Sequence, residues 1–538
     1  MASFYVQNFG CRATQADGAA IERQFEERGL DRASELGKAE IVVLNTCTVT
    51  SSADQDARAA IRRVHRENPQ ARIVVTGCYA QRSPEELAGL PGVSQVIGNS
   101  HKHQLAQIAI DERIHAGVAD PLSFVPLRTL TAAWDSSQGP TTNDQRLGFS
   151  RRPTTDDRRR VWVSDIFAHT ELLAAPVFDA ANERTRPNLK VQDGCDNRCS
   201  FCVIPYVRGQ SRSLKLDEIL QEIKALVSAG YRELVISGIN LGRWGRDLEA
   251  VVDQVSGVRS QVSGLRTTAH ANDDTARDVG FSQRPTTNDQ QLVLTRRSTT
   301  DNRRLVALLR AILYHTSLEK LRISSVEPMD WSDELIGLVA RSPRIAKHAH
   351  VPMQSGSDAV LRRMHRKYRP WHYREKIEKI RAAMPTAAIG ADVMVGFPGE
   401  TEVEFAETRR MIEDLPFTYL HVFTYSARPG TPAADMMNQV PVRVARERNR
   451  ILRELSEKKK LSFMRSFVGE TVEAITLSGG SDVPVGGTSP VFTEALTDNY
   501  LKLRLSGQHE PNRWVQAQVE RCRDGALVAS LREPAFSM

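Results

Sequence analysis

Six short apolar runs recur between about residues 188 and 433, and each passes into a polar loop rich in Gly or Pro. In order they read LKVQDGC, ELVISGIN, LRISSVEP, AHVPMQSG, IGADVMVGFPGE and YLHVFTYSARPGTP. Segments with helical periodicity, such as LDEILQEIKALVSAG, separate them. Repeated strand–helix alternation favours parallel strands joined by right-handed crossovers. The sequence therefore predicts an α/β protein with a central open, partial (β/α) barrel over residues 186–466, whose chemistry lies at the C-terminal ends of the strands.

The N-terminal residues 1–115 show the same alternation on a smaller scale. The runs FYVQNFG, IVVLNTC and IVVTGC are typical of buried strands. Cys11, Cys47 and Cys78 each follow one of these strands. Because parallel strands end at the same edge of a sheet, where open α/β folds place their ligands, the three cysteines can converge in space.

The C-terminal residues 467–538 follow a charged helical segment and have a different pattern. The short runs TVEAITL, YLKLRL, WVQAQVE and ALVASL are separated by Gly and Asp. This pattern predicts a small antiparallel β-barrel of the OB-like kind.

Two stretches, residues 116–185 and 250–304, do not follow the alternation. Both are rich in Thr, Arg, Asp, Asn and Gln, and the segments SRRPTTDDRRR and TRRSTTDNRR nearly repeat one another. Polar segments of this composition cannot bury a core, so we expect insertions that form disordered loops.

Composition limits the classes of protein that this chain can belong to. The 538 residues contain 41% hydrophobic residues and carry a formal charge of +7, which permits nucleic-acid binding without requiring it. No apolar run is long enough to span a membrane, and the start MASFYVQNFG lacks the features of a secretory signal, so we expect a cytoplasmic protein with no membrane partner. Seven cysteines are too few, and odd in number, for a disulfide scaffold, which favours metal or redox roles.

The strongest motif is Cys195-x-x-x-Cys199-x-x-Cys202, directly after a predicted strand. Three thiolates at this spacing bind three irons of a [4Fe–4S] cluster and leave the fourth iron open. A structural zinc site normally needs four protein ligands, and no fourth Cys or His lies nearby in the sequence. We therefore predict a catalytic cluster on these three cysteines, with Phe201 placed to pack on an adenine ring.

This motif resembles the signature of the radical S-adenosylmethionine (SAM) superfamily. The resemblance implies that SAM binds at the strand ends, although a Ser or Glu at such a position is also often a helix cap. The candidate SAM-binding residues are Phe201, Ser237, Gly238, Asn240, Ser325, Glu327, Gln354 and Asp392.

The whole pattern resembles one family within that superfamily, the methylthiotransferases. The three N-terminal cysteines, CDNRCSFCVIPYVRGQSRS, MVGFPGET, YSARPGTPA and the C-terminal barrel carry the resemblance, which covers about residues 1–113, 187–249 and 304–534. It implies a second [4Fe–4S] cluster on Cys11, Cys47 and Cys78, a TRAM-like RNA-binding barrel and an S-adenosyl-L-methionine-dependent reaction. One cluster would reduce SAM to a radical, and the other would present the methylated sulfur. An electron donor such as flavodoxin or ferredoxin and an unidentified sulfur donor are also implied.

The segment Asn45–Thr50 resembles the branch that modifies C2 of N6-threonylcarbamoyladenosine at position 37 of tRNA, next to the anticodon. Phe9–Cys11 resembles the same branch, but Arg12 stands where Lys is usual. Three alternatives stay open: action on N6-isopentenyladenosine in tRNA, action on a ribosomal protein, and an inactive iron–sulfur RNA-binding relative. The last is motivated by the second insertion, which follows the Ser237–Asn240 loop.

Basic residues after the fourth strand and on the charged helix suit a tRNA partner. Such residues would supply salt-dependent, sequence-independent contacts with phosphates, although a solvated helix face explains the Lys459 region equally well. The candidate RNA-binding residues are Arg363, Arg366, Lys367, Arg450 and Lys459.

Overall fold

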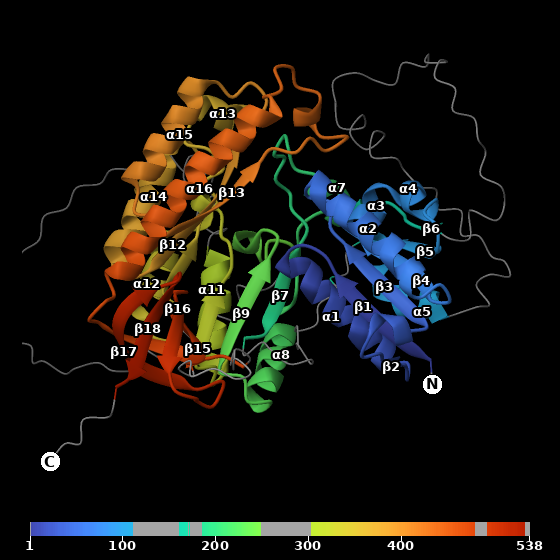
Figure 1. Ribbon diagram of the computed structural model, residues 1–538, viewed down its shortest axis with the longest axis horizontal. Helices are drawn as coiled ribbons and strands as arrows, with labels where there is room; N and C mark the ends of the chain where they lie inside the picture. Colours follow the sequence, from blue (N-terminus) through green and yellow to red (C-terminus); the bar gives the residue numbers. More distant parts are fainter. Residues whose placement is uncertain are drawn as a thin grey trace, which may run out of the picture.

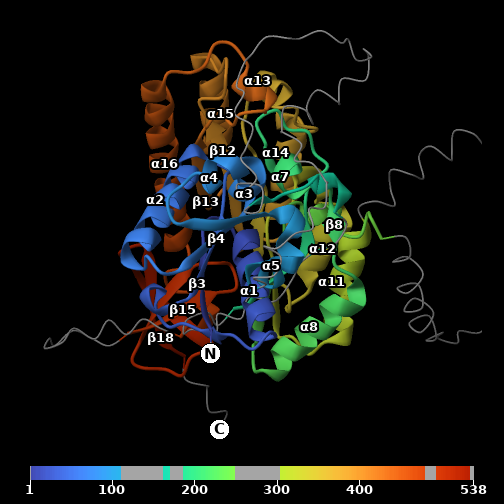
Figure 2. The same cartoon turned by 90° about the vertical axis from the view of Figure 1, so that its right-hand side faces the viewer.

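A computed structural model describes residues 2–110, 161–169, 172, 186–248, 303–478 and 492–532. Figure 1 shows an N-terminal domain (blue) beside a central half-barrel of strands, with a small C-terminal barrel (red) at the opposite end. In the view of Figure 2 the N-terminal domain lies in front of the central strands. Among the described helices, none is both long enough and apolar enough to cross a bilayer.

The N-terminal domain is a parallel sheet in the order β2-β1-β3-β4-β5-β6, which confirms the predicted α/β domain. Its strands are β1 (Ser3–Asn8), β2 (Asp31–Arg32), β3 (Ile41–Thr46), β4 (Arg72–Gly77), β5 (Val93–Gly98) and β6 (Val161–Trp162). Its helices are α1 (Arg12–Glu26), α2 (Ser51–Glu67), α3 (Cys78–Arg82), α4 (Pro84–Ala88) and α5 (Leu105–Ile110). Helix α2 begins where the Thr50 side chain accepts a hydrogen bond from the Ala53 amide, and it buries Ala57, Ile61 and Val64.

The central domain has six parallel strands in the order β7-β9-β10-β11-β12-β13, as predicted. They form two sheets, and the chain closes the gap between β10 and β11 where the Leu321 amide donates to the Arg344 carbonyl at 2.8 Å. The strands are β7 (Asn188–Asp193), β9 (Glu233–Gly238), β10 (Lys320–Ile323), β11 (His348–His350), β12 (Ala388–Val395) and β13 (Tyr419–Thr424), with β8 (Arg212–Ser213) antiparallel to β7.

Helices cover the outer face of these strands because their apolar residues recur every three or four positions. In α8, for example, Ile219, Ile223 and Leu226 are buried against the strands in one continuous core. The helices of this domain are α8 (Leu216–Ser228), α11 (Arg303–His315), α12 (Asp333–Arg341), α13 (Asp358–Arg363), α14 (Pro370–Ala383), α15 (Glu402–Asp414) and α16 (Val442–Arg465), with the short α7 (Ile204–Arg208) packed against Cys78 of the N-terminal domain.

The C-terminal domain is a closed barrel in the order β14-β15-β16-β18-β17. Its strands are β14 (Thr471–Thr476), β15 (Phe492–Thr497), β16 (Lys502–Ser506), β17 (Trp514–Arg523) and β18 (Ala526–Leu531). Four of the five were predicted, and β15 was missed because Glu494 and Ala495 weaken its strand pattern. The strands β16 and β18 pair in parallel and close the barrel. The sequence predicted an antiparallel barrel, so this one pair differs from the prediction. Cys522 is partly buried and packs against the apolar core of this barrel.

The two predicted insertions fall mostly outside the described residues. Within 116–185, Val161–Trp162 pairs with β5 as the sixth strand of the N-terminal sheet, and the Ser164 amide donates to Ser100 Oγ at 3.0 Å. This short segment is therefore part of the domain rather than of a loop. Within 250–304, α11 begins at Arg303.

Candidate active site

The loop that carries Cys195, Cys199 and Cys202 leaves the C-terminal end of β7. Gly194 turns the chain with φ +71, and a Cβ there would lie 1.9 Å from the Gln210 carbonyl oxygen, so no other residue fits without moving the backbone. The Cys195 amide donates to the Gly209 carbonyl at 3.1 Å, and the Cys202 amide donates to the Cys199 carbonyl at 3.1 Å. The loop is thus fixed at both ends.

Hydrogen-bond donors approach two of these sulfur atoms. Asn240 Nδ2 lies 3.7 Å from Cys195 Sγ, and Arg366 Nη1 lies 3.2 Å from Cys199 Sγ. Burial raises the pKa of Cys195 to about 11 and also raises the pKa of Cys202, and the neighbouring Cys199 thiol adds to both shifts. Neighbouring thiolates repel one another, so a set of three thiolates is stable only beside a strong positive charge, which iron provides. The donor set therefore fits a [4Fe–4S] cluster.

The second set of cysteines lies at the C-terminal edge of the N-terminal sheet. Cys11 precedes α1, Cys47 follows β3, and Cys78 begins α3 directly after β4. Gly77 has φ +98, and a Cβ at this position would lie 2.3 Å from the Thr46 carbonyl oxygen. The tight turn therefore places Cys78 beside β3.

The Cys47 thiol lies close enough to the other two thiols for their charges to act on it. Burial raises the pKa of Cys47 to about 12, and the thiols of Cys78 and Cys11 raise it further. Asn99 Nδ2 lies 3.6 Å from Cys78 Sγ, and Thr14 Oγ1 lies 3.6 Å from Cys11 Sγ. Like Cys195, Cys199 and Cys202, these three cysteines have hydrogen-bonding groups next to their sulfur atoms. Their three sulfur donors therefore also suit an iron–sulfur cluster.

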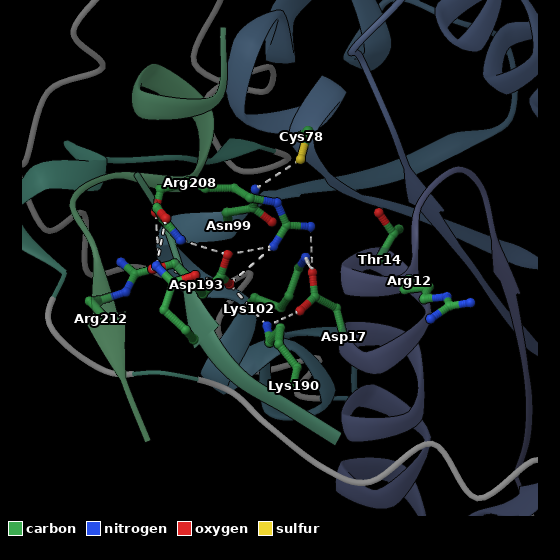
Figure 3. Close-up of polar contacts among 12 residues, drawn as sticks. Arg12, Thr14, Asp17, Cys78, Asn99, Lys102, Lys190, Asp193, Arg208 and Arg212 are labelled. Carbon is green, nitrogen blue, oxygen red and sulfur yellow. Dashed lines mark hydrogen bonds and ion pairs between the residues drawn. The ribbon is translucent and has the colours of Figure 1, made fainter. Parts of the chain in front are cut away.

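A buried ion-pair network connects the two cysteine-bearing regions (Figure 3). Asp17 of α1 accepts hydrogen bonds from Lys190, from Lys102 at 2.9 Å and from Arg208 at 2.9 Å. Asp193, which ends β7, binds Lys190 at 2.9 Å and Arg208 at 2.9 Å. All five residues are buried.

Three buried cations face two carboxylates in this network, and Arg212 lies 4.0 Å from Asp193 as a fourth cation, so positive charge is in excess. Although burial raises the pKa of Asp17 and of Asp193, the nearby cations lower both below their usual value. The pKa of Arg208 is raised well above its usual value: burial opposes this shift, and Asp17, Asp193 and the Cys78 and Cys11 thiols outweigh it. The network therefore holds the N-terminal domain against the barrel and supplies positive charge beside the N-terminal cysteines.

The network was not predicted from the sequence. Its members are separated by up to 191 positions. Arg208 lies within the segment CDNRCSFCVIPYVRGQSRS, but nothing in that segment indicates its partners Asp17 and Asp193. The one local signal is Asp193–Gly194 immediately before the CxxxCxxC loop. Gly77, directly before Cys78, and Gly194, directly before Cys195, both occupy turns that admit only glycine. A glycine directly before a cysteine is therefore a local sequence signal for these two turns.

The candidate SAM-binding residues lie around the CxxxCxxC loop. Ser237 and Gly238 end β9, and the Asn240 amide donates to Gln192 Oε1 at 2.7 Å. Ser237 Oγ and Asn240 Oδ1 are buried and have no hydrogen-bond partner within the described part of the chain. Buried polar atoms are normally paired, so these two atoms fit the polar groups of a bound SAM molecule.

Other members of that set have partners of their own. Phe201 packs edge-on against Phe397, with ring centroids 6.4 Å apart. Glu327 forms an ion pair with Arg366, which joins it to Cys199, while Ser325 lies in the loop after β10. Gln354 lies after β11 with φ 61. Asp392 lies within β12 rather than at its end, and its carboxylate contacts His350 and His421.

The candidate RNA-binding residues differ in their surroundings. Arg363 forms a two-point contact with Glu404 at 3.0 and 2.8 Å, and Arg366 is only 7% exposed, inside the Cys199 region. Lys459 Nζ donates to the Glu413 and Leu415 carbonyls, each at 2.9 Å. Lys367 and Arg450 are exposed, and Arg450 pairs with Glu447 and Glu454 on α16. Exposure therefore favours Lys367 and Arg450 as residues that can reach a phosphate.

A partial (β/α) barrel that carries CxxxCxxC at the end of its first strand defines a radical SAM protein. The radical SAM superfamily model matches residues 189–266 and 287–412, and the model of the uncharacterized protein family UPF0004 matches residues 3–98. The chain is 31% identical over 512 residues to the threonylcarbamoyladenosine tRNA methylthiotransferase MtaB of Bacillus subtilis, covering 95% of this chain and 92% of that protein. It is 29% identical over 528 residues to the tRNA-2-methylthio-N(6)-dimethylallyladenosine synthase of Thermobifida fusca, covering 96% and 83%.

Among solved structures, the radical SAM methyltransferase TsrM from Kitasatospora setae aligns with a TM-score of 0.45 and 14% identity, covering 80% of this chain and 75% of that chain. The sequence relationship is much stronger. With the match to the Bacillus subtilis protein over nearly its full length, this chain belongs to the radical SAM methylthiotransferase family. Membership implies SAM and a [4Fe–4S] cluster as cofactors.

Proposed function

We propose that this chain transfers a methylthio group to C2 of N6-threonylcarbamoyladenosine at position 37 of tRNA. The observation that carries the proposal is the pair of three-cysteine sets, which come from different domains and border one buried ion-pair network. The 31% identity with a threonylcarbamoyladenosine tRNA methylthiotransferase supports the choice of substrate.

The proposal assigns the first cluster and SAM to Cys195, Cys199 and Cys202, and a second [4Fe–4S] cluster to the N-terminal cysteines. When bound, these groups supply the one-electron chemistry and the sulfur that replacement of an unactivated C–H hydrogen requires. The protein's own part is to position and insulate them. Asn240 and Arg366 direct N–H groups at Cys195 and Cys199, and hydrogen bonds to cluster sulfurs tune their potential.

Within the same proposal, the partner is tRNA in the cytoplasm, through its anticodon stem-loop. Lys367 and Arg450 are exposed and able to contact phosphates, and the C-terminal barrel is the TRAM-like module of the proposal. A flavodoxin or a ferredoxin would supply the electron. A sulfur donor is a further partner of the reaction.

The test is nucleoside mass spectrometry of tRNA from a host that lacks its own methylthiotransferases, makes both candidate adenosine modifications and expresses this chain. We expect the methylthio form of N6-threonylcarbamoyladenosine. Cys199→Ala should abolish SAM cleavage, whereas Cys47→Ala should retain cleavage and lose sulfur transfer. Reconstituted protein should hold about eight irons per chain, and each variant about four.

Cys522→Ala, which changes a cysteine in the C-terminal barrel, is the matched control and should keep both the iron and the product. A methylthio form of isopentenyladenosine would overturn the substrate and keep the reaction. If the cluster-loaded protein makes neither product, the result would favour action on a ribosomal protein or an inactive relative. Four irons in the unaltered protein would contradict the N-terminal cluster.

A further inference from the structure

Three adjacent strands bring two histidines and one aspartate together on the inner face of the central half-barrel. On β13, Leu420 and Val422 belong to the core under the helices, so Tyr419, His421 and Phe423 point the other way. Asp392 of β12 pairs directly with His421 across the sheet, and His350 ends β11. Parallel pairing of β11, β12 and β13 therefore fixes this cluster.

The distances within the cluster suit a metal ion. His350 Nε2 and His421 Nδ1 lie 3.2 and 3.4 Å from the same oxygen, Asp392 Oδ1. The three ligand atoms all lie within 4.8 Å of one another. Two ligands bound to tetrahedral Zn²⁺ at about 2.0–2.1 Å are about 3.4 Å apart, so the side chains need little movement to coordinate one ion.

The surroundings hold His350 in the orientation that ligation requires. Its other ring nitrogen, Nδ1, lies 3.0 Å from Tyr419 Oη, and that hydroxyl also lies 2.7 Å from His348 Nε2. Gly390 makes room for Tyr419, since a Cβ there would lie 2.0 Å from the phenol ring. A ligating histidine normally has its second nitrogen hydrogen-bonded in this way, which leaves Nε2 for the metal.

One side of the cluster is open. The side chain of His350 is 7% exposed, that of Asp392 is 27% exposed and that of His421 is 56% exposed. Two imidazoles, one carboxylate and an open side form the ligand pattern of zinc sites that keep a position for water or substrate.

We propose that His350, Asp392 and His421 bind one Zn²⁺ ion, with a free coordination position toward the inside of the half-barrel. This site contains no cysteine and is separate from both three-cysteine sets. In this assignment Asp392 serves the zinc site rather than SAM.

The proposal is tested on the full chain with its iron–sulfur clusters reconstituted, so that the six cysteines are occupied. The protein is incubated anaerobically with Zn²⁺ and freed of excess, and zinc and iron are measured by mass spectrometry. We expect about one zinc per chain with unchanged iron, and X-ray absorption should show only nitrogen and oxygen ligands at about 2.0–2.1 Å.

His421→Ala and Asp392→Asn should each weaken zinc binding at least tenfold while the iron content stays the same. His421 is accessible, so its replacement should not impair folding, which circular dichroism will check. His372→Ala, an exposed histidine on α14, is the matched control and should bind zinc normally. Absence of zinc, sulfur ligands at about 2.3 Å, or unchanged binding in His421→Ala would each overturn the proposal.

Discussion

Single glycines decide where the cysteines point. Gly77 has φ +98, and a Cβ at position 77 would meet the Thr46 carbonyl oxygen, whereas Gly29 in the same domain has φ +77 with nothing within 4 Å. We expect Gly29→Ala to lower the free energy of unfolding by about 1–2 kcal/mol, the cost of a left-handed conformation. Gly77→Ala should cost more, since the backbone must also move, and it should lose iron toward the content of one cluster. Urea unfolding and iron analysis check both variants; equal losses of stability would contradict the close contact.

The first turn of helix α15 caps its own helix and also binds an arginine of helix α13. Thr401 and Glu404 form a capping box: the Thr401 hydroxyl accepts from the Glu404 amide at 3.3 Å, and the Glu404 carboxylate accepts from the Thr401 amide at 2.8 Å. Glu404 also holds Arg363 of α13. Thr401→Ala should cost about 1 kcal/mol of stability in urea unfolding. Glu404→Ala should cost more because it removes a cap and also takes away the carboxylate partner of Arg363. Equal costs would show that the Arg363 pair contributes nothing.

The stability of the whole molecule depends on Asp17 and Asp193, the buried carboxylates between the N-terminal domain and the central domain. Asp17→Asn should lower the free energy of unfolding by about 3–5 kcal/mol at neutral pH, because it leaves buried cations without their partner. The cations lower the pKa of Asp17 in the folded state, so its contribution is complete above the unfolded value of about 3.9 and is lost as the pH falls toward the folded value. The difference between variant and parent in urea unfolding should therefore shrink in acid.

Asp414→Asn provides the control for this pH dependence. Asp414 pairs with Arg374 at 2.9 Å, but its side chain is 57% exposed. An exposed pair contributes about 0–1 kcal/mol, so this variant should stay close to the parent protein at every pH. A pH-independent deficit in Asp17→Asn would show that its cost comes from packing rather than from charge.

Local patterns predicted most of the fold and the position of the six cysteines at the ends of strands. Strand–helix alternation predicted a parallel N-terminal sheet and the six strands of the half-barrel, whereas the order β2-β1-β3-β4-β5-β6 of the N-terminal sheet came from the structure. The prediction omitted β5 and the two-residue strands β2 and β8. It also omitted β15, whose residues alternate poorly, and β6, which lies alone in a polar stretch. The strands β15 and β6 are fixed by their partners in the sheet rather than by their own sequence, because strand preference depends on what packs beside it.

The sequence by itself determined the class of chemistry, since the spacing of Cys195, Cys199 and Cys202 and the placement of Cys11, Cys47 and Cys78 after strands are local properties. Only the tertiary structure decided which distant groups meet. It placed Arg366 beside Cys199, joined Asp17 to Arg208, and aligned His350, Asp392 and His421 on three strands. Such contacts depend on strand register and on the docking of domains, and no pattern within a short window of sequence encodes either of them.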